Sequence, residues 1–167
     1  MKIYNTEDSI QKKSDSVKKW DLRFLSLAKH ISSWSKDPST KVGAVIVDEN
    51  RRILGLGYNG FPRNIPDNEN EYENRILKYQ MIVHAEANAI LNSPLLQFSK
   101  YSCLYVYPLF VCNECTKLII QSGIKRIVTI NYNNERFKES FEISKKMLTS
   151  ANIPYMIYDK KLLESEP

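Results

Sequence analysis

Two short motifs in this sequence hold residue types that can bind a metal ion and move protons. The first is His84-Ala85-Glu86, and the second, Cys112-Asn113-Glu114-Cys115, begins 28 residues later (112 − 84). One imidazole and two thiolates are three ligands, which leave a tetrahedral zinc ion one open position for water. Zinc lowers the pKa of such a water to about 7 and so makes hydroxide available. Glu86 lies two residues beyond the histidine, where it can take and return protons without binding the metal.

Each motif is expected to open a helix. His84 begins a helical pattern over 84–92, and Cys112 begins another over 112–121 that ends before Gly123. Cys112 and Cys115 lie about one turn apart, so both thiolates can project from the same helix end. The partial positive charge of a helix N-terminus lowers thiol pKa values and favours the thiolate form. The spacing therefore predicts a catalytic zinc site.

A C-x-x-C pair also occurs in redox dithiols and in half of a structural zinc site. A structural site needs a fourth ligand, and the remaining candidates are Cys103 and His30. Cys103 falls within an alternating strand pattern and is expected in the core, whereas His30 is expected to be a surface or packing residue of the first helix. A thioredoxin-like oxidoreductase would carry its pair after the first strand and would leave His84 and Glu86 without a role.

The elements that position these motifs follow from hydrophobic periodicity. The pattern predicts helices over 20–34, 84–92, 112–121 and 134–150, a short helix within 69–82, and strands over 42–47, 53–58, 103–107, 127–130 and 153–158. This order indicates an α/β fold in which a mixed sheet of about five strands carries helices on both faces. We expect a single domain over 18–160, a loose N-terminal arm over 1–17 and a frayed tail over 161–167.

Composition excludes several classes of protein. The 167 residues are 43% hydrophobic and 26% charged, which excludes a disordered chain. No apolar run approaches the ~20 residues of a membrane span, and no apolar segment near the start suggests a signal peptide, so a cytoplasmic location is expected. The net charge of +5 suits an anionic ligand. The basic residues are scattered, which argues against a nucleic-acid partner.

The two motifs together resemble the H-x-E and C-x-x-C signature of zinc-dependent nucleobase deaminases. More of the chain, from about 20 to about 157, resembles the deoxycytidylate (dCMP) deaminase family. The segments that carry this resemblance are 35–44, 57–62, 78–79, 84–90 and 113–124. Among them, Gly57-Tyr58-Asn59-Gly60 and the run 113–121 favour the dCMP branch. The resemblance implies the three-layer α/β/α cytidine-deaminase-like fold.

The resemblance also implies a reaction. Zinc-activated water attacks C4 of the cytosine ring, Glu86 shuttles the protons, and dCMP becomes dUMP and ammonia, which would supply thymidylate synthesis. Val111 stands where the family normally has proline before the first cysteine, so some preorganisation of the zinc site is expected to be lost. Residues 60–83 contain neither His nor Cys, so one zinc per chain is expected, without the second zinc of some phage members.

Several substrate contacts are implied in the same way. Asn59 would bind the sugar hydroxyl, Tyr107 and Phe110 would stack on the base, and Lys78 and Tyr79 would help to hold the phosphate. The free backbone N–H groups near Ala85 and Cys112 are helix-end donors for the pyrimidine carbonyl. Other interpretations stay open: a turn asparagine for Asn59, core packing for the two aromatic residues, and a solvated side chain for Lys78.

The family is commonly a homohexamer that dCTP activates and dTTP inhibits. Gly57, Tyr58 and Gly60 match a loop near the effector site, although a tight turn explains the glycines equally well. Alternative functions are a zinc deaminase of another nucleotide or of tRNA adenosine, and a non-catalytic zinc-binding module. The acidic tail argues against tRNA, and Glu86 argues against the non-catalytic module, because a structural zinc site has no need of it.

Overall fold

A computed structural model describes residues 6–164 of the chain, apart from 96, 100 and 132–133. Its helices are α1 (Thr6–Ser32), α2 (Glu69–Glu73), α3 (Arg75–Met81), α4 (Ala85–Leu91), α5 (Asn113–Ser122), a 3-10 turn η1 (Glu135–Phe137), α6 (Lys138–Ser150) and α7 (Lys161–Glu164). Its strands are β1 (Gly43–Val47), β2 (Ile53–Tyr58), β3 (Cys103–Tyr107), β4 (Arg126–Ile130) and β5 (Tyr155–Tyr158).

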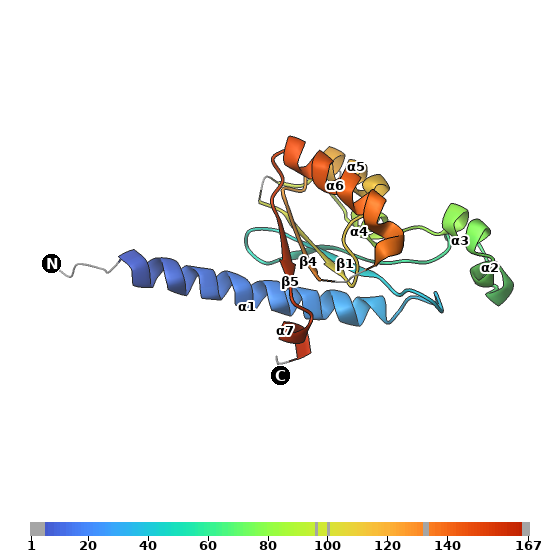
Figure 1. Ribbon diagram of the computed structural model, residues 1–167, viewed down its shortest axis with the longest axis horizontal. Helices are drawn as coiled ribbons and strands as arrows, with labels where there is room; N and C mark the ends of the chain where they lie inside the picture. The colour runs from blue at the N-terminus through green and yellow to red at the C-terminus, as the bar shows by residue number, and fades with distance from the viewer. Residues whose placement is uncertain (1–5, 96, 100, 132–133, 165–167) are drawn as a thin grey trace.

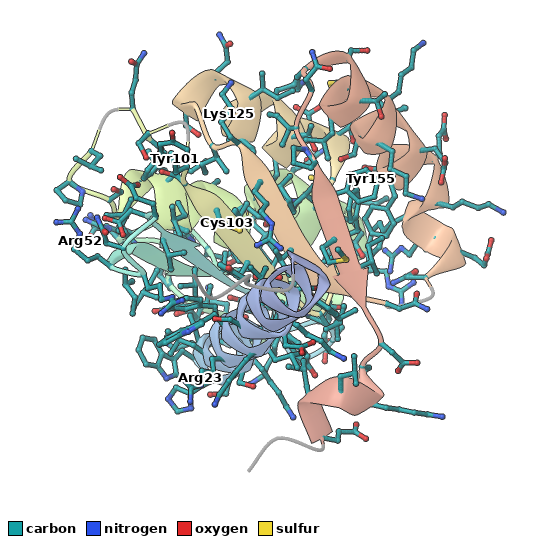
Figure 2. The ribbon with its side chains drawn as sticks, turned by 90° about the vertical axis from the view of Figure 1, so that its left-hand side faces the viewer. Arg23, Arg52, Tyr101, Cys103, Lys125 and Tyr155 are labelled. Carbon is teal, nitrogen blue, oxygen red and sulfur yellow. The ribbon has the colours of Figure 1, made fainter. Side chains whose placement is uncertain are left out.

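The five strands form one mixed sheet in the order β2-β1-β3-β4-β5. β1 pairs antiparallel with β2 and β3, whereas β3 with β4 and β4 with β5 are parallel pairs. Figure 2 shows Arg52, beside β2, and Tyr155, in β5, on opposite sides of the sheet, with Cys103 of β3 between them. The predicted mixed sheet of about five strands is thereby confirmed.

Helices cover both faces of this sheet, as expected for a three-layer α/β/α arrangement. α1 lies along one face, and α4, α5 and α6 lie over the other (Figure 1). Side chains of β3 alternate between the two hydrophobic cores: Leu104 and Val106 face the α4–α5 side, whereas Cys103 and Tyr105 face α1.

The two ends of the described chain differ from expectation. A loose arm was expected over 1–17, but α1 is helical from Thr6, and residues 1–5 lie outside the described part. In the expected tail, residues 161–164 form α7, and 165–167 again lie outside the description. None of the helices in the described ranges is both long enough and apolar enough to cross a membrane.

One buried carboxylate ties α1 to three strands. Asp21, 1% exposed, accepts hydrogen bonds from the Tyr105 hydroxyl at 2.8 Å, from the Arg126 guanidinium at 2.7 and 2.6 Å and from the Tyr158 hydroxyl at 2.9 Å. Burial, together with the neighbouring carboxylate, raises the pKa of Tyr158 to about 12. These bonds hold α1 against β3, β4 and β5.

A glycine sets the distance between β2 and the helix that carries the first motif. A Cβ built on Gly57 would lie 2.2 Å from the carbonyl oxygen of Ala85 and 2.3 Å from the backbone nitrogen of Ala89. Real Cβ atoms do not approach backbone so closely, so α4 can reach this strand only because residue 57 has no side chain. This contact places the start of α4, and with it His84, against the sheet.

Candidate active site

The first and second motifs meet because both open helices on the same face of the sheet. His84 is the N-cap of α4, Cys112 is the N-cap of α5, and the two helices contact each other. The His84 Nδ1 atom lies 3.4 Å from Cys112 Sγ and 3.3 Å from Cys115 Sγ. The three ligand atoms all lie within 4.8 Å of one another.

This geometry fits a zinc ion. With Zn–S near 2.3 Å and Zn–N near 2.0–2.1 Å, a tetrahedral ion separates a nitrogen and a sulfur ligand by about 3.6 Å. The observed separations of 3.4 and 3.3 Å are close to that value. His84, Cys112 and Cys115 are therefore suited to hold one zinc ion with a fourth position open. They are also the one such cluster of ligands found among the described residues, in keeping with one zinc per chain.

The surroundings of Cys112 favour its thiolate. Hydrogen bonds from Cys115 and His84 lower the pKa of Cys112 to about 4, although burial opposes that shift. The backbone N–H of Cys115 donates to Cys112 Sγ at 3.3 Å. The thiolate is the form that binds zinc, so Cys112 is suited to bind metal, whereas the hydrogen bond with Cys112 and burial raise the pKa of the Cys115 thiol.

Glu86 is a buried carboxylate beside the ligands. It lies in the first turn of α4 and is 4% exposed. Burial raises its pKa, an effect that the nearby His84 partly opposes. A carboxylate with a raised pKa accepts a proton more readily and can then pass it on, as a general acid and base must. The structure thus places Glu86 where the sequence predicts it, next to the metal ligands and outside the ligand cluster.

The other candidates for a fourth ligand lie elsewhere. Cys103 is buried in the core on the α1 face of the sheet, opposite α4 and α5, and burial raises the pKa of its thiol to about 12. His30 is exposed on α1, with its ring 5.9 Å from that of Trp34. The expectations of a core cysteine and a surface histidine are both confirmed.

A cavity of about 280 Å³ opens above this cluster. This volume is just below the ~300–1,000 Å³ usual for ligand sites. His84, Glu86 and Cys112 line it, together with side chains from the loop before β1, the end of α3 and the start of α6. Ala85 also lines the cavity, and it is the first residue of α4, where backbone N–H groups have no partner within the helix.

Asn59 lines the cavity, but its side chain is already engaged. Its Oδ1 accepts from the Val42 backbone N–H at 2.7 Å, and its Nδ2 donates to the Thr40 carbonyl at 2.9 Å and to Asp37 at 3.4 Å. These bonds fix the loop before β1 against the end of β2. The contact with the sugar hydroxyl therefore stays a prediction, and in this structure neither hydrogen of the amide is free to make it.

Lys78 is neither solvated nor free. Its side chain is 3% exposed and forms an ion pair at 3.0 Å with Asp37, whose side chain is 2% exposed, and its ammonium also donates to Ser39 Oγ at 2.6 Å. Burial by itself raises the pKa of Asp37. The backbone N–H of Ser39, the ammonium of Lys78 and the N–H of Thr40 outweigh it and hold that pKa below its usual 3.8. The alternative interpretation of Lys78 as a solvated lysine is wrong, and the predicted phosphate contact would compete with this pair.

The predicted aromatic residues divide between two places. Phe110 lines the cavity and packs edge-on against Phe141, with ring centroids 5.9 Å apart. Tyr79 also lines it and is 42% exposed. Tyr107 packs against the core on the α1 face of the sheet instead. Its expected stacking on the base is corrected accordingly, because alternation along β3 turns residues 103, 105 and 107 away from the metal ligands.

The effector residues remain predictions, but the structure gives two of them local roles. Gly57 allows α4 to approach β2, as described above. Tyr58 is 41% exposed, with its ring 6.1 Å from that of Trp34. Gly60 forms an isolated bridge with Val83, and a Cβ there would meet no atom within 4 Å. A tight turn does not account for either glycine, since Gly57 lies within β2, Gly60 lies in a β-bridge, and neither has a positive φ.

Sequence reasoning missed part of the cavity wall. Phe137, Ser140 and Phe141 line it from η1 and the start of α6. Ser140 donates to the Asn113 side chain at 2.7 Å and accepts from the Asn113 backbone N–H at 3.1 Å, which joins α6 to the start of α5. The amphipathic pattern over 134–150 contained Phe137 and Phe141, but periodicity cannot tell a core contact from a cavity wall.

Comparison with known proteins agrees with this site. Residues 18–131 match the cytidine and deoxycytidylate deaminase zinc-binding region. The chain is 41% identical over 148 residues to a probable deoxycytidylate deaminase of Drosophila melanogaster, across 81% of this chain and 70% of that protein. It is 38% identical over 136 residues to the deoxycytidylate deaminase of Homo sapiens, across 78% and 74% of the two chains.

A solved structure shows the same fold. The dCMP deaminase from the cyanophage S-TIM5, in complex with dCMP and dUMP, superposes with a TM-score of 0.62 at 24% identity, over 81% of this chain and 93% of that one. The match in sequence spans both motifs and most of the sheet, and the three ligands meet in space as zinc requires. This chain is therefore a member of the cytidine and deoxycytidylate deaminase family and a zinc-dependent hydrolytic deaminase.

Proposed function

We propose that this chain deaminates dCMP to dUMP and ammonia. The observation that carries the proposal is the buried carboxylate of Glu86 beside a three-ligand zinc site, at the wall of a cavity of about 280 Å³. The choice of dCMP among cytosine nucleotides is supported by relatives at 38–41% identity that are named deoxycytidylate deaminases.

In the reaction, water adds across the N3=C4 bond of the cytosine ring, and the exocyclic amine then leaves as ammonia. When bound, zinc supplies a water that ionises near neutral pH. Glu86 accepts the proton of that water, donates a proton to N3 of the ring and later delivers one to the leaving amine. A C4–O bond forms, the bond between C4 and the exocyclic nitrogen breaks, and uracil and ammonia result. Burial of Glu86 keeps bulk water from competing for these protons.

Other residues of the cavity orient the pyrimidine. The free N–H of Ala85 is placed to donate to the pyrimidine carbonyl, and Phe110 offers a ring to the base. Asn59 holds the loop before β1 in place through Val42 and Thr40, and in this way shapes the sugar end of the cavity.

The wider assignment follows the family. The enzyme works in the cytoplasm as a homohexamer, supplies dUMP for thymidylate synthesis and responds to dCTP and dTTP through the loop that contains Gly57, Tyr58 and Gly60. Its dependence on effectors is tested by kinetics: a rate that is hyperbolic in dCMP and indifferent to both triphosphates would remove the regulatory part of the proposal.

The substrate is tested by ammonia release from a panel of nucleosides, monophosphates and triphosphates, with Glu86→Gln as the inactive control. We expect dCMP to be turned over much faster than deoxycytidine, dCTP or purine nucleotides. Equal kcat/KM values for dCMP and deoxycytidine would contradict the proposal and indicate a cytidine deaminase instead.

A further inference from the structure

A phosphate group at the mouth of the cavity needs a positive charge that no carboxylate already neutralises. Lys78, the lysine in the cavity wall, is bound by Asp37 and Ser39 and is almost fully buried. Its charge is offset at 3.0 Å, and a phosphate could take it only by displacing Asp37. A phosphate in this cavity would therefore bind a cation outside the Lys78–Asp37 pair.

Arg136 is an exposed cation next to two residues of the cavity wall. Its Cζ atom lies 4.7 Å from the ring centroid of Tyr79 and 5.4 Å from that of Phe137, and both rings line the cavity. The guanidinium thus extends from η1 toward Tyr79 near the end of α3, beside two residues that line the same cavity. Within the described part of the chain, no ion pair engages its side chain.

Two acidic residues near this part of the cavity wall already have ion-pair partners. Glu135 pairs with Lys138 at 3.5 Å, and Glu114, which also lines the cavity, pairs with Lys117 at 2.6 Å. Neither carboxylate pairs with Arg136. The guanidinium lies near two aromatic rings, whose cation–π attraction leaves its N–H groups available.

From this arrangement we infer that Arg136 binds the 5′-phosphate of the nucleotide and makes the site select a monophosphate over a nucleoside. The inference rests on the proposed function and adds the residue that reads the phosphate. A guanidinium binds phosphate through two parallel N–H···O bonds, and stacking on Tyr79 and Phe137 orders its side chain before the substrate arrives. Tyr79 accordingly contributes as a platform for the arginine.

The test compares two ratios in the zinc-loaded enzyme: kcat/KM for dCMP over deoxycytidine, and the affinity for dUMP over deoxyuridine by calorimetry. Arg136→Ala should lower both ratios by about 10- to 100-fold, the loss of one charged hydrogen-bonding partner. Arg136→Lys should give ratios between those of the wild type and those of Arg136→Ala, because lysine keeps the charge but lacks the planar guanidinium. Lys138→Ala, which removes a paired cation two residues away, is the matched control and should leave both ratios unchanged.

The outcomes separate the inference from the proposed function. If the wild-type protein prefers nucleotides and Arg136→Ala keeps that preference, the role of Arg136 is refuted while dCMP remains the substrate. A loss shared equally by nucleotide and nucleoside would also refute it, because it would mean that Arg136 only supports the fold. If the wild-type protein itself shows no preference, both the inference and the proposed function fail.

Discussion

Replacing Lys78 by methionine should destabilise the protein far more than the loss of an ordinary lysine. The Lys78 and Asp37 side chains are 3% and 2% exposed and 3.0 Å apart. Removing one partner of a buried pair costs about 3–5 kcal/mol, because the other charge stays buried without compensation. Asp37 would keep the backbone N–H of Ser39 at 2.8 Å and that of Thr40 at 3.1 Å, so we expect the low end, about 3 kcal/mol.

The assay is urea unfolding at saturating zinc, and the chain offers a matched control. Lys36 pairs with Asp67 at 2.7 Å, but those side chains are 70% and 31% exposed, so Lys36→Met should cost about 0–1 kcal/mol. For a chain of this size, about 3 kcal/mol corresponds to a Tm lower by about 6–12 °C. If Lys78→Met and Lys36→Met unfold at the same urea concentration, the burial argument is wrong.

The pH dependence of the unfolding free energy provides a second test of the Lys78–Asp37 pair. The pKa of Asp37 is lowered in the folded protein, so its ionised form contributes stability above its unfolded pKa near 3.8, and this contribution is lost as the pH falls through the lower folded value. Without Lys78 the pKa of Asp37 should rise. The difference in unfolding free energy between the wild type and Lys78→Met should therefore shrink below about pH 4, and a constant difference would contradict the assignment.

Three further substitutions, two of them paired with a control variant, test the site. Glu86→Ala should keep zinc by metal analysis and lose about 10⁴-fold or more in kcat, the upper end of what general acid–base catalysis supplies. Glu114→Gln should change the rate only modestly. Loss of zinc from Glu86→Ala would show that Glu86 supports the metal. Cys115→Ser should lose zinc and lower the Tm, because metal binding at thiolates stabilises the fold; full activity with no zinc would overturn the site. Gly57→Ala should destabilise the protein and displace α4, while Gly60→Ala should fold normally, as circular dichroism and zinc content would show; equal behaviour would contradict the close approach.

The zinc site could be predicted because its signal is local. His84 and Cys112 are themselves the N-cap residues of their helices, so the motif that contains each ligand also marks where its helix begins. Strands β1 and β3 were visible for the same reason, as short apolar runs between turn residues. Gly123, expected at the end of α5, has φ 88° and caps that helix in the left-handed conformation.

The ion pair in the cavity wall could not be predicted in this way. Lys78 and Asp37 are 41 residues apart, and a lysine on a short charged helix is ordinarily solvated. The first turns of α1 were missed because residues 6–17 lack a continuous apolar stripe, although their helix propensities are good. The side of the sheet on which Tyr107 lies could have been predicted. Strict alternation along the strand places Tyr107 on the side opposite Val106, toward α1.

The carboxylate of Asp21 has a consequence for synthesis on the ribosome. Its helix emerges first, but its partners Tyr105, Arg126 and Tyr158 follow 84, 105 and 137 residues later. The metal ligands are all translated by residue 115, so the pocket can begin to assemble while the face of the sheet under α1 still lacks its last strand. Long-range contacts of this kind form late and slowly. The nascent chain therefore carries an amphipathic helix without its final partners until β5 is complete, and this interval is when a chaperone would find an apolar surface to bind.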